Sequence, residues 1–185
     1  MSDPGAHRVE RECVEGYLYS TPPLRLLLFQ RSPARGGFWV PISGKVEPGD
    51  ADFLAALRRE LVEETGLTAP LAIRALDWHQ PFDGPNGAVW RLHAYAVRVP
   101  AGWTPRLSDE HVAYRWVDPA TAVAELHFSD NRRAVELLVE QERGPARSAG
   151  PLRSGPWGSG RVPRHRVGDR RPVRSGPAHR LRRSR

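Results

Sequence analysis

Cysteine is almost absent from this sequence. Cys13 is the only one in 185 residues, so an intrachain disulfide and a zinc site built from several cysteines are both excluded. No run approaches the roughly eighteen consecutive apolar residues that a membrane-spanning helix needs. The first residues, MSDPGAHRVERE, lack the apolar core of a secretory signal. We therefore expect a cytoplasmic protein with no membrane association.

Lysine is also nearly absent, and arginine carries the basic charge. Lys45 is the only lysine among 28 basic residues, and the net charge is +7. This charge is unevenly distributed, because residues 144–185 contain 12 arginines and a single acid, Asp169, whereas residues 1–143 carry a net charge of −4. The sequence pI of about 10.6 therefore reflects the C-terminal part. It is poor evidence that the rest of the chain binds nucleic acid.

The C-terminal segment has a composition that opposes folding. Residues 144–185 contain seven glycines and six prolines, and their few large apolar residues follow neither a helical nor a strand period. Such a segment cannot bury enough apolar surface to offset the entropy of ordering it. We predict a folded domain over residues 8–143 and a disordered basic tail over residues 144–185. The charge of this tail suits weak, salt-sensitive contacts with nucleic acid.

Before the tail, strand-like and helix-like patterns alternate, which predicts an α/β fold with helices layered on a mixed sheet. Residues 24–31 are apolar enough for a central strand, and leucines recur at helical spacing within residues 51–65. A turn is expected over residues 81–87, and Asp130 is expected to cap the last helix. Further strands are predicted over 12–19, 38–43, 72–79, 89–99 and 112–117, and further helices over 119–126 and 130–142.

Three glutamates gather on one face of the helix predicted over residues 51–65. At about 100° per residue, Glu60, Glu63 and Glu64 fall within roughly 100° of one another, and like charges at this spacing repel. Arg59 balances part of this charge through Glu63, four residues later. A divalent cation such as Mg²⁺, which prefers carboxylate, phosphate and water oxygens, suits the remainder. The alternative is a solvated acidic face without a ligand.

The segment from Gly44 to Leu67, GKVEPGDADFLAALRRELVEETGL, resembles the Nudix box. That family signature is G-x5-E-x7-R-E-U-x-E-E-x-G-U, where U is apolar. The second half matches without a gap from Arg59 onward. In the first half, Asp50 stands at the position of the family's first glutamate, and eight residues rather than seven separate it from Arg59. Either Asp50 or Asp52 is expected to replace that glutamate, which in the family mainly braces the loop.

The resemblance continues in residues 108–117, SDEHVAYRWV. They are similar to the E-H-x-A-Y-x-W segment of bacterial hydrolases acting on nucleoside triphosphates, pterin triphosphates and dinucleoside polyphosphates. The resemblance covers most of residues 8–143 and none of the tail. It implies a Nudix-type α/β/α sandwich around a mixed β-sheet, and a hydrolase that depends on Mg²⁺ or Mn²⁺.

The implied reaction cleaves the pyrophosphate linkage of a small nucleotide, a (deoxy)nucleoside triphosphate or a dinucleoside polyphosphate. Alternatives are a nucleotide-sensing module without catalysis, and nucleic-acid association through the tail. The resemblance also implies that Arg59 orients a glutamate by an ion pair and that Glu60 or Glu110 is the general base. It places metal ligands at the carboxylates of Glu60, Glu63 and Glu64 and at the backbone carbonyl of Ser43.

Three further side chains are expected near the substrate. Trp39 borders the box loop and is a candidate for stacking on a base, with core packing as the alternative. Lys45 lies in the box loop, where phosphates would sit, and His111 follows Glu110. Both are candidate phosphate contacts, with a solvated or structural side chain as the alternative. Cys13 is expected to be buried in a strand.

Overall fold

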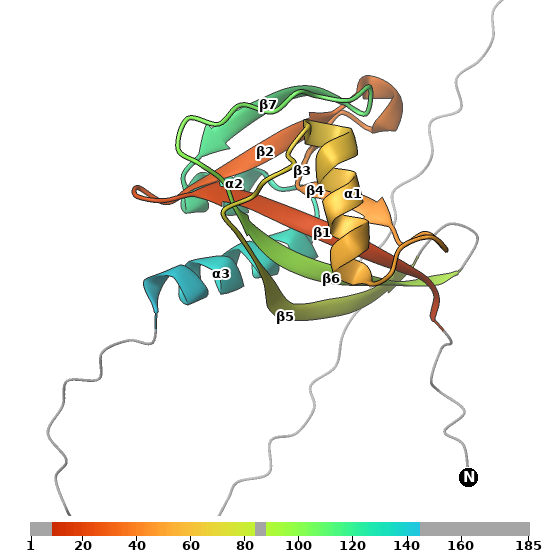
Figure 1. Ribbon diagram of the computed structural model, residues 1–185. Helices are drawn as coiled ribbons and strands as arrows, with labels where there is room; N and C mark the ends of the chain where they lie inside the picture. Colours follow the sequence, from red (N-terminus) through yellow and green to blue (C-terminus); the bar gives the residue numbers. More distant parts are fainter. Residues whose placement is uncertain (1–8, 84–87, 145–185) are drawn as a thin grey trace, which may run out of the picture. The chain divides into compact units, whose positions relative to one another are not determined.

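The computed structural model describes residues 9–83 and 88–144 (Figure 1). The predicted tail over residues 144–185 therefore lies outside the described residues, apart from Gly144. The described strands are β1 (Val9–Ser20), β2 (Arg25–Arg31), β3 (Trp39–Val40), β4 (Ile42–Lys45), β5 (Ala72–Asp83), β6 (Val89–Arg98) and β7 (His111–Val117). The described helices are the short 3₁₀ turn η1 (Pro33–Arg35), α1 (Phe53–Thr65), α2 (Pro119–Glu125) and α3 (Ser129–Arg143).

The strands form one mixed sheet with β1 at its centre. The main path runs β3-β2-β1-β6-β5, while β7 pairs with β2 and β4 pairs with β1. β1 and β6 are parallel, and the other pairs are antiparallel. β1 pairs with β2 at Tyr19 and Ser20, whereas β4 pairs with β1 from Cys13 to Gly16. β2 therefore pairs with the C-terminal end of β1, and β4 pairs with an earlier part of β1.

Both faces of the sheet are covered by helices, which confirms the predicted α/β/α sandwich (Figure 1). In β2, Leu26 and Leu28 pack in the core beneath α2 and α3, whereas Leu27 and Phe29 pack in the core beneath α1. Side chains alternate between the faces of a strand, so an uninterrupted apolar run requires two buried faces. The run over residues 24–31 is therefore the central strand that the sequence predicts.

α1 has well-defined ends. The Asp52 side chain accepts a hydrogen bond from the backbone N–H of Ala55 at 2.7 Å, and Gly66 ends the helix in the left-handed conformation at φ +71°. The helix lies close to β1, because a Cβ atom on Gly16 would be 3.1 Å from the Leu57 side chain. Capping and close packing together hold the position of α1 over the sheet.

Several expected bounds differ from the structure: β1 begins at Val9, the strand expected over residues 38–43 is divided into β3 and β4, and α1 begins at Phe53. Two further differences concern β5 and α3. β5 continues through Pro81 to Asp83, because β5 pairs with β6 alone and a strand at the edge of a sheet tolerates a residue without an N–H donor. The expected turn is thereby shortened, and residues 84–87 lie outside the described residues. Asp130 lies inside the first turn of α3, and Phe128 occupies the N-cap position. The helix ends at Arg143 before Gly144, as the sequence predicts.

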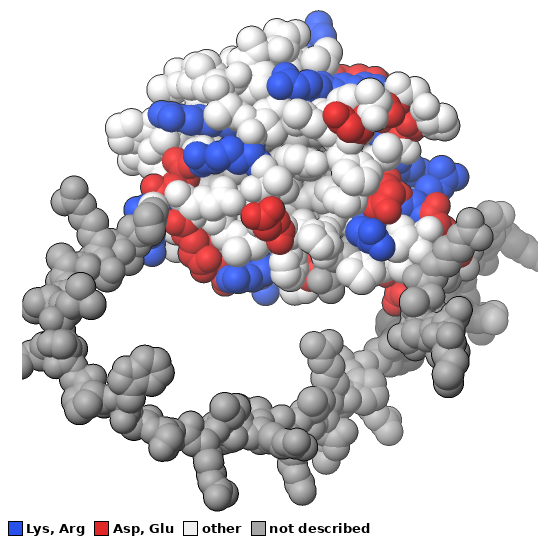
Figure 2. All heavy atoms as spheres, turned by 60° about the horizontal axis from the view of Figure 1, so that its bottom comes forward, with Lys and Arg blue, Asp and Glu red and all other residues white. Residues whose placement is uncertain are grey.

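Two further features of the described residues are the length of the helices and the distribution of charge on the surface. Across residues 9–83 and 88–144, no helix is both long and apolar enough to cross a bilayer. On the face drawn in Figure 2, acidic and basic side chains of the described residues are interspersed. This mixture agrees with the small net charge of residues 1–143. A surface that binds a phosphate backbone is predominantly positive, and the face drawn in Figure 2 is not.

Two leucines test the packing of α1. Leu57 is fully buried, whereas Leu71 is 60% exposed. We expect Leu57→Ala to lower the free energy of unfolding by about 2–5 kcal/mol, because it leaves a cavity between α1 and the sheet. Leu71→Ala is the matched control and should change it by about 0.5 kcal/mol or less. Urea unfolding measures both variants, and equal losses would contradict the packing described here.

Candidate active site

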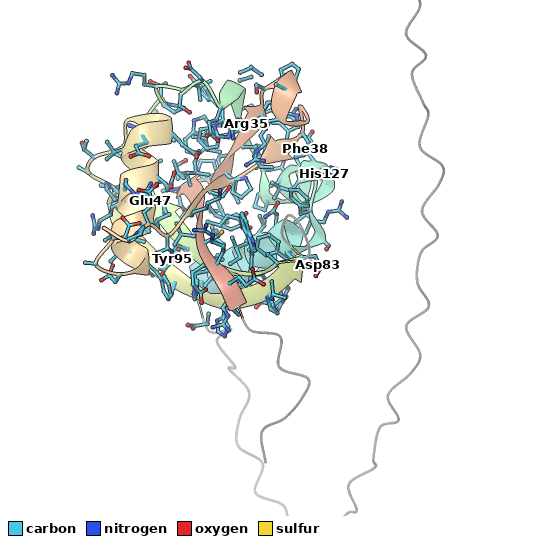
Figure 3. All side chains as sticks on the ribbon, turned by 90° about the vertical axis from the view of Figure 1, so that its right-hand side faces the viewer. Arg35, Phe38, Glu47, Asp83, Tyr95 and His127 are labelled. Carbon is cyan, nitrogen blue, oxygen red and sulfur yellow. The ribbon has the colours of Figure 1, made fainter. Side chains whose placement is uncertain are left out.

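A pocket of about 650 Å³ lies beside the second half of α1. Figure 3 labels two of its lining residues, Arg35 of η1 and Glu47 of the loop after β4. The pocket brings together residues that are far apart in the sequence. Its walls are formed by Cys13, Glu15, Arg31, Arg35, Val40, Ser43, Gly44, Lys45, Glu47, Arg59, Glu60, Glu63, Glu64, Phe82, Trp90, Leu92, Glu110, Phe128, Asp130 and Asn131.

Glu60 lies directly over the backbone of β4. An ideal Cβ atom built on Gly44 would be 1.9 Å from the Glu60 carboxylate, so only glycine leaves room for this side chain. Burial raises the pKa of Glu60, while Arg59 opposes this change by donating to the carboxylate at 2.7 Å. The first glycine of the predicted box and its first helical glutamate are therefore parts of one packed unit.

Arg59 joins the loop to the helix. Its guanidinium forms an ion pair with Asp50 at 3.0 Å, and it donates a hydrogen bond to the backbone carbonyl of Lys45 at 2.8 Å. It also lies 3.4 Å from Glu63. Of the two aspartates that the sequence left open, Asp50 contacts this arginine, while Asp52 caps the helix. The segment between Asp50 and Arg59 is thus one residue longer than in the family signature, and the ion pair between these two side chains still forms.

Glu64 is the least compensated acid in the pocket. It is buried, and its Oε2 atom has no hydrogen-bond partner among the described residues. Burial, together with the negative charges of Glu60 and Glu110, raises the pKa of Glu64 to about 8. A buried carboxylate near two others is unfavourable as an anion unless a cation lies close by.

The donor set suits a hard divalent cation. Glu60, Glu63 and Glu64 supply carboxylate oxygens to one pocket that Ser43 also lines, and Glu63 is the most exposed of the three acids. Within the described part of the chain, no group of three or more His, Cys, Asp or Glu side chains is placed so that it could hold a metal ion by itself. Mg²⁺ commonly takes one or two carboxylates and completes its shell with water and phosphate oxygens. The residues present therefore fit this ion, with the unpartnered oxygen of Glu64 as the main indication.

Two arginines that the sequence analysis did not single out line the pocket. Arg35 forms an ion pair with Glu110 at 2.8 Å. Arg31 lines the pocket, and its buried Nε atom has no hydrogen-bond partner among the described residues. Neither arginine lies in the box or in the segment after Glu110, so no local motif indicates them. Their presence beside the acids becomes visible only when β2 and α1 are packed together.

Aromatic side chains line another part of the pocket. Phe82 of β5 and Trp90 of β6 contact each other edge to face at 6.0 Å, and Phe128 lies just before α3. The Lys45 ammonium lies 5.3 Å from the centre of the Trp90 ring. The predicted lysine thus lines the pocket, together with the predicted acids and Ser43.

Two predicted substrate contacts do not line this pocket. Trp39 packs against the core beneath α2 and α3, and the guanidinium of Arg115 lies 4.3 Å from its ring centre. His111 is buried against Phe29, with its Nδ1 atom 3.8 Å from Glu64. Burial lowers the pKa of His111 to about 4, so it is neutral at pH 7 and lacks the charge that a cationic phosphate contact requires. Both residues occupy inward strand positions, which accounts for their packing.

A polar network in the pocket wall joins β1 to α3. Glu15 of β1 accepts hydrogen bonds from the Tyr17 hydroxyl and from the Asn131 side-chain amide, the latter at 2.9 Å. All three side chains are buried. Burial raises the pKa of Glu15 to about 7, although both hydrogen bonds oppose this change. The available sequence signal was a charged residue inside a predicted strand, since such residues are rarely buried without partners.

Comparisons with known proteins agree with this architecture. A model of the NUDIX domain matches residues 18–138. An octanoyltransferase of Myxococcus xanthus is 41% identical over 118 residues, which cover 62% of this chain and 32% of that protein. This chain therefore spans about a third of that relative. An asymmetrical bis(5'-nucleosyl)-tetraphosphatase of Sus scrofa is 31% identical over 109 residues, which cover 53% of this chain and 67% of that protein.

The fold is also found among solved structures. The dihydroneopterin triphosphate pyrophosphohydrolase of E. coli matches with a TM-score of 0.62 and 24% identity, over 71% of this chain and 98% of that chain. This likeness shows the shared fold. The family model covers the box, the helix with its acidic face and the strands β2 to β7, and it begins after the residues of β1 that line the pocket. The chain belongs to the Nudix family.

Proposed function

We propose that this protein hydrolyses the pyrophosphate linkage of a nucleoside diphosphate derivative with the help of Mg²⁺ or Mn²⁺. The substrate is a (deoxy)nucleoside triphosphate or a dinucleoside polyphosphate. The observation that carries this proposal is the buried Glu64 carboxylate, unpartnered at one oxygen and placed beside Glu60. The name of the tetraphosphatase relative supports the nucleotide class. The pocket volume of about 650 Å³ falls in the range typical of small-molecule sites.

The acidic part of the pocket supplies the metal-binding groups. Glu60, Glu63 and Glu64 would hold the cation, with the Ser43 carbonyl as a further oxygen donor. When bound, the ion acts as a Lewis acid on the phosphoryl oxygens and lowers the pKa of the attacking water. Arg59 keeps the Glu60 carboxylate over Gly44 through its 2.7 Å contact.

The cationic groups of the pocket suit the phosphate chain. Arg31 has a buried guanidinium nitrogen without a partner, and Lys45 extends from the box loop. Arginine forms strong, directional hydrogen bonds with phosphate oxygens. We assign Arg31 to a phosphate of the substrate, because binding there would satisfy its unpartnered nitrogen.

Two carboxylates are candidates for the general base. Glu60 is buried and paired with Arg59, whereas Glu110 is more exposed and paired with Arg35. The charge of Glu110 contributes to the raised pKa values of both Glu60 and Glu64, which places it near the metal-binding acids. Either group can accept a proton from water once its arginine has turned toward a phosphate.

Three other functions have less support. A nucleotide-sensing module needs no buried acids beside an arginine, and the complete acidic set favours catalysis. The name of the Myxococcus relative suggests acyl transfer. Cys13 is a poor nucleophile for such a reaction, because burial raises the pKa of its thiol to about 11. Nucleic-acid association through the predicted tail stays a prediction, since it concerns residues outside the described ranges.

Replacing Glu64 tests the proposed metal role. We expect Glu64→Gln to lower turnover by about two orders of magnitude or more, because the charge is lost while the shape is kept. Chromatographic separation of the nucleotide products over a nucleotide panel, with Mg²⁺ or Mn²⁺, measures this. The metal-free variant should melt no lower than wild type, because an amide needs no buried countercharge. Added metal should raise its melting temperature less than that of wild type.

Glu136→Gln is the matched control for this substitution, because Glu136 lies on the outer surface of α3 and pairs with Arg133. It should leave both turnover and the response to metal unchanged. Full activity of Glu64→Gln, or of wild type in excess chelator, would refute the proposed role of the metal. Absence of hydrolysis across the nucleotide panel would refute the proposed substrate class.

A pair of glycines tests the position of Glu60. A methyl group on Gly44 must displace the Glu60 carboxylate, whereas one on Gly49 meets no atom within 4 Å. We expect Gly44→Ala to reduce kcat about tenfold or more, because the displaced carboxylate no longer lies in its working position. Gly49→Ala should retain wild-type kcat. If the two variants had the same kcat, the close approach at Gly44 would have no catalytic importance.

The phosphate assignment of Arg31 gives a further prediction. Arg31→Gln removes a charged hydrogen-bond donor, and we expect kcat/KM to fall about tenfold or more. Arg132→Gln is the control, since Arg132 lies on α3 and bonds to the Leu126 carbonyl. Steady-state kinetics of both variants on one nucleotide substrate provide the comparison. An unchanged kcat/KM for Arg31→Gln would show that this arginine makes no contact with the substrate.

A further inference from the structure

His111 is a buried polar residue to which the proposed function gives no role. Neither of its ring nitrogens has a hydrogen-bond partner among the described residues. Its Nδ1 atom lies 3.8 Å from Oε2 of Glu64, which is the carboxylate oxygen that also lacks a partner. Buried polar atoms without partners are unfavourable and uncommon in folded proteins. A single hydrogen bond between these two atoms would satisfy both of them.

An irregularity at the start of β7 turns His111 toward α1. Tyr114 pairs with Phe29 of β2, and the register then shifts so that His111 pairs with Arg31. Val112 is the extra residue of this bulge, and it is 55% exposed. Paired residues face the same side of a sheet, so His111 shares the face of Phe29, which packs beneath α1. Without the bulge, the alternation of side chains would place His111 on the opposite face.

The loop before β7 is tied to the last turn of α1. The backbone N–H of Ser108 donates to the Glu64 carbonyl at 3.2 Å, and that of Arg106 donates to the Thr65 carbonyl at 2.9 Å. The backbone N–H of His111 then donates to the Ser108 carbonyl at 3.3 Å. Main-chain hydrogen bonds thus hold Glu64 and His111 next to each other. A small rotation of either side chain brings the two atoms from 3.8 Å to hydrogen-bond distance.

The chemistry of the two groups determines which of them donates. Burial lowers the pKa of His111 to about 4, so its ring is neutral at pH 7 and carries a single N–H. An ionised carboxylate accepts hydrogen bonds but donates none. The ring proton therefore belongs on Nδ1 when Glu64 is ionised. A carboxylate offers about four acceptor positions, so one hydrogen bond from His111 leaves the others for a cation.

We propose that His111 is a positioning residue, which donates a hydrogen bond from Nδ1–H to the Glu64 carboxylate and thereby orients it toward the metal ion. The inference rests on the proposed function in taking Glu64 as a metal ligand. Residues that orient metal ligands commonly contribute about 10- to 100-fold to metal affinity. The histidine after Glu110 therefore acts on the acids of α1, and it makes no contact with the substrate.

The position of the ring proton tests the hydrogen bond in the wild-type protein. Protein labelled with nitrogen-15 histidine is studied by NMR without metal at about pH 9.5, above the raised pKa of Glu64, so that the carboxylate is ionised. The His111 signals are assigned through the contact of its ring with Phe29. We expect the proton on Nδ1, because the hydrogen bond selects the tautomer. A proton on Nε2 would overturn the inference.

Two substitutions separate the hydrogen bond from packing. His111→Asn supplies an amide N–H near the position of Nδ1, whereas His111→Leu fills the site with an apolar side chain. We expect His111→Leu to weaken Mn²⁺ binding about tenfold or more, and His111→Asn to stay within about threefold of wild type. Electron paramagnetic resonance of free Mn²⁺ measures the affinity without nucleotide. If only packing were important, the buried leucine would be tolerated better than the asparagine.

His79→Leu is the matched control, because His79 is exposed on β5 and does not line the pocket. This variant should keep the wild-type affinity for Mn²⁺. Equal affinities of His111→Leu and wild type would overturn the inference, and so would weaker binding by His111→Asn than by His111→Leu. Circular dichroism checks the folding of each variant. The NMR measurement needs no variant, so it decides the question if a substitution prevents folding.

The two measurements separate this inference from the proposed function. Mn²⁺ binding with the ring proton on Nε2 would refute the role of His111 and leave the proposed reaction intact. A ring proton on Nδ1 without binding of Mn²⁺ would refute the proposed metal site, while the hydrogen bond from His111 to Glu64 would stand.

Discussion

The gathering of negative charge on one face of α1 is the constraint on which the site depends. Glu60 and Glu64 are buried next to each other, and burial raises the pKa of both. Arg59 neutralises one side of this group by joining Glu60, Glu63 and Asp50. The Glu64 oxygen without a partner suits the cation proposed for this site, so an arrangement that is unfavourable in isolation is consistent with the proposed binding of a metal ion and a polyphosphate.

The approach of α1 to the sheet allows this arrangement to form. Gly16 lets Leu57 reach β1, and Gly44 lets the Glu60 carboxylate lie against β4. Because interiors are closely packed, a side chain at either position would move α1 or its acids. The Arg59 contact with the Lys45 carbonyl then ties the loop to the helix. Packing and charge therefore act on the same few residues, which explains why the box includes glycines as well as acids.

β1 connects the two parts of the pocket. Its edge pairs with β4, which carries Gly44, and the same strand places Glu15 beside Asn131 of α3. The acids of α1 and the amide of α3 come from opposite sides of the sheet and meet in one pocket. β1 therefore joins the acidic part of the pocket to the part that contains the buried amide of Asn131.

Sequence patterns alone predicted the sandwich, the extent of α1 and the acids of the box, because helical spacing and strand alternation are local properties. The uninterrupted apolar run in β2 identified a strand with two buried faces for the same reason. The expected turn at Pro81 was placed too early, since β5 tolerates proline only because of its position at the sheet edge. Local patterns carry no information about which strand lies at an edge.

What the tertiary structure decided was which distant side chains share the pocket. Trp39 and His111 stand near the box and its matching segment in sequence, yet their strands direct them into the interior. Arg31 and Asn131 lie outside every motif and reach the pocket through the packing of β2 and α3. The sequence by itself determined the family and the position of the glutamates proposed as metal ligands, since their spacing is set within one helix. Contacts between elements depend on sheet order and on the faces that pack, and these arise only when the whole domain is folded.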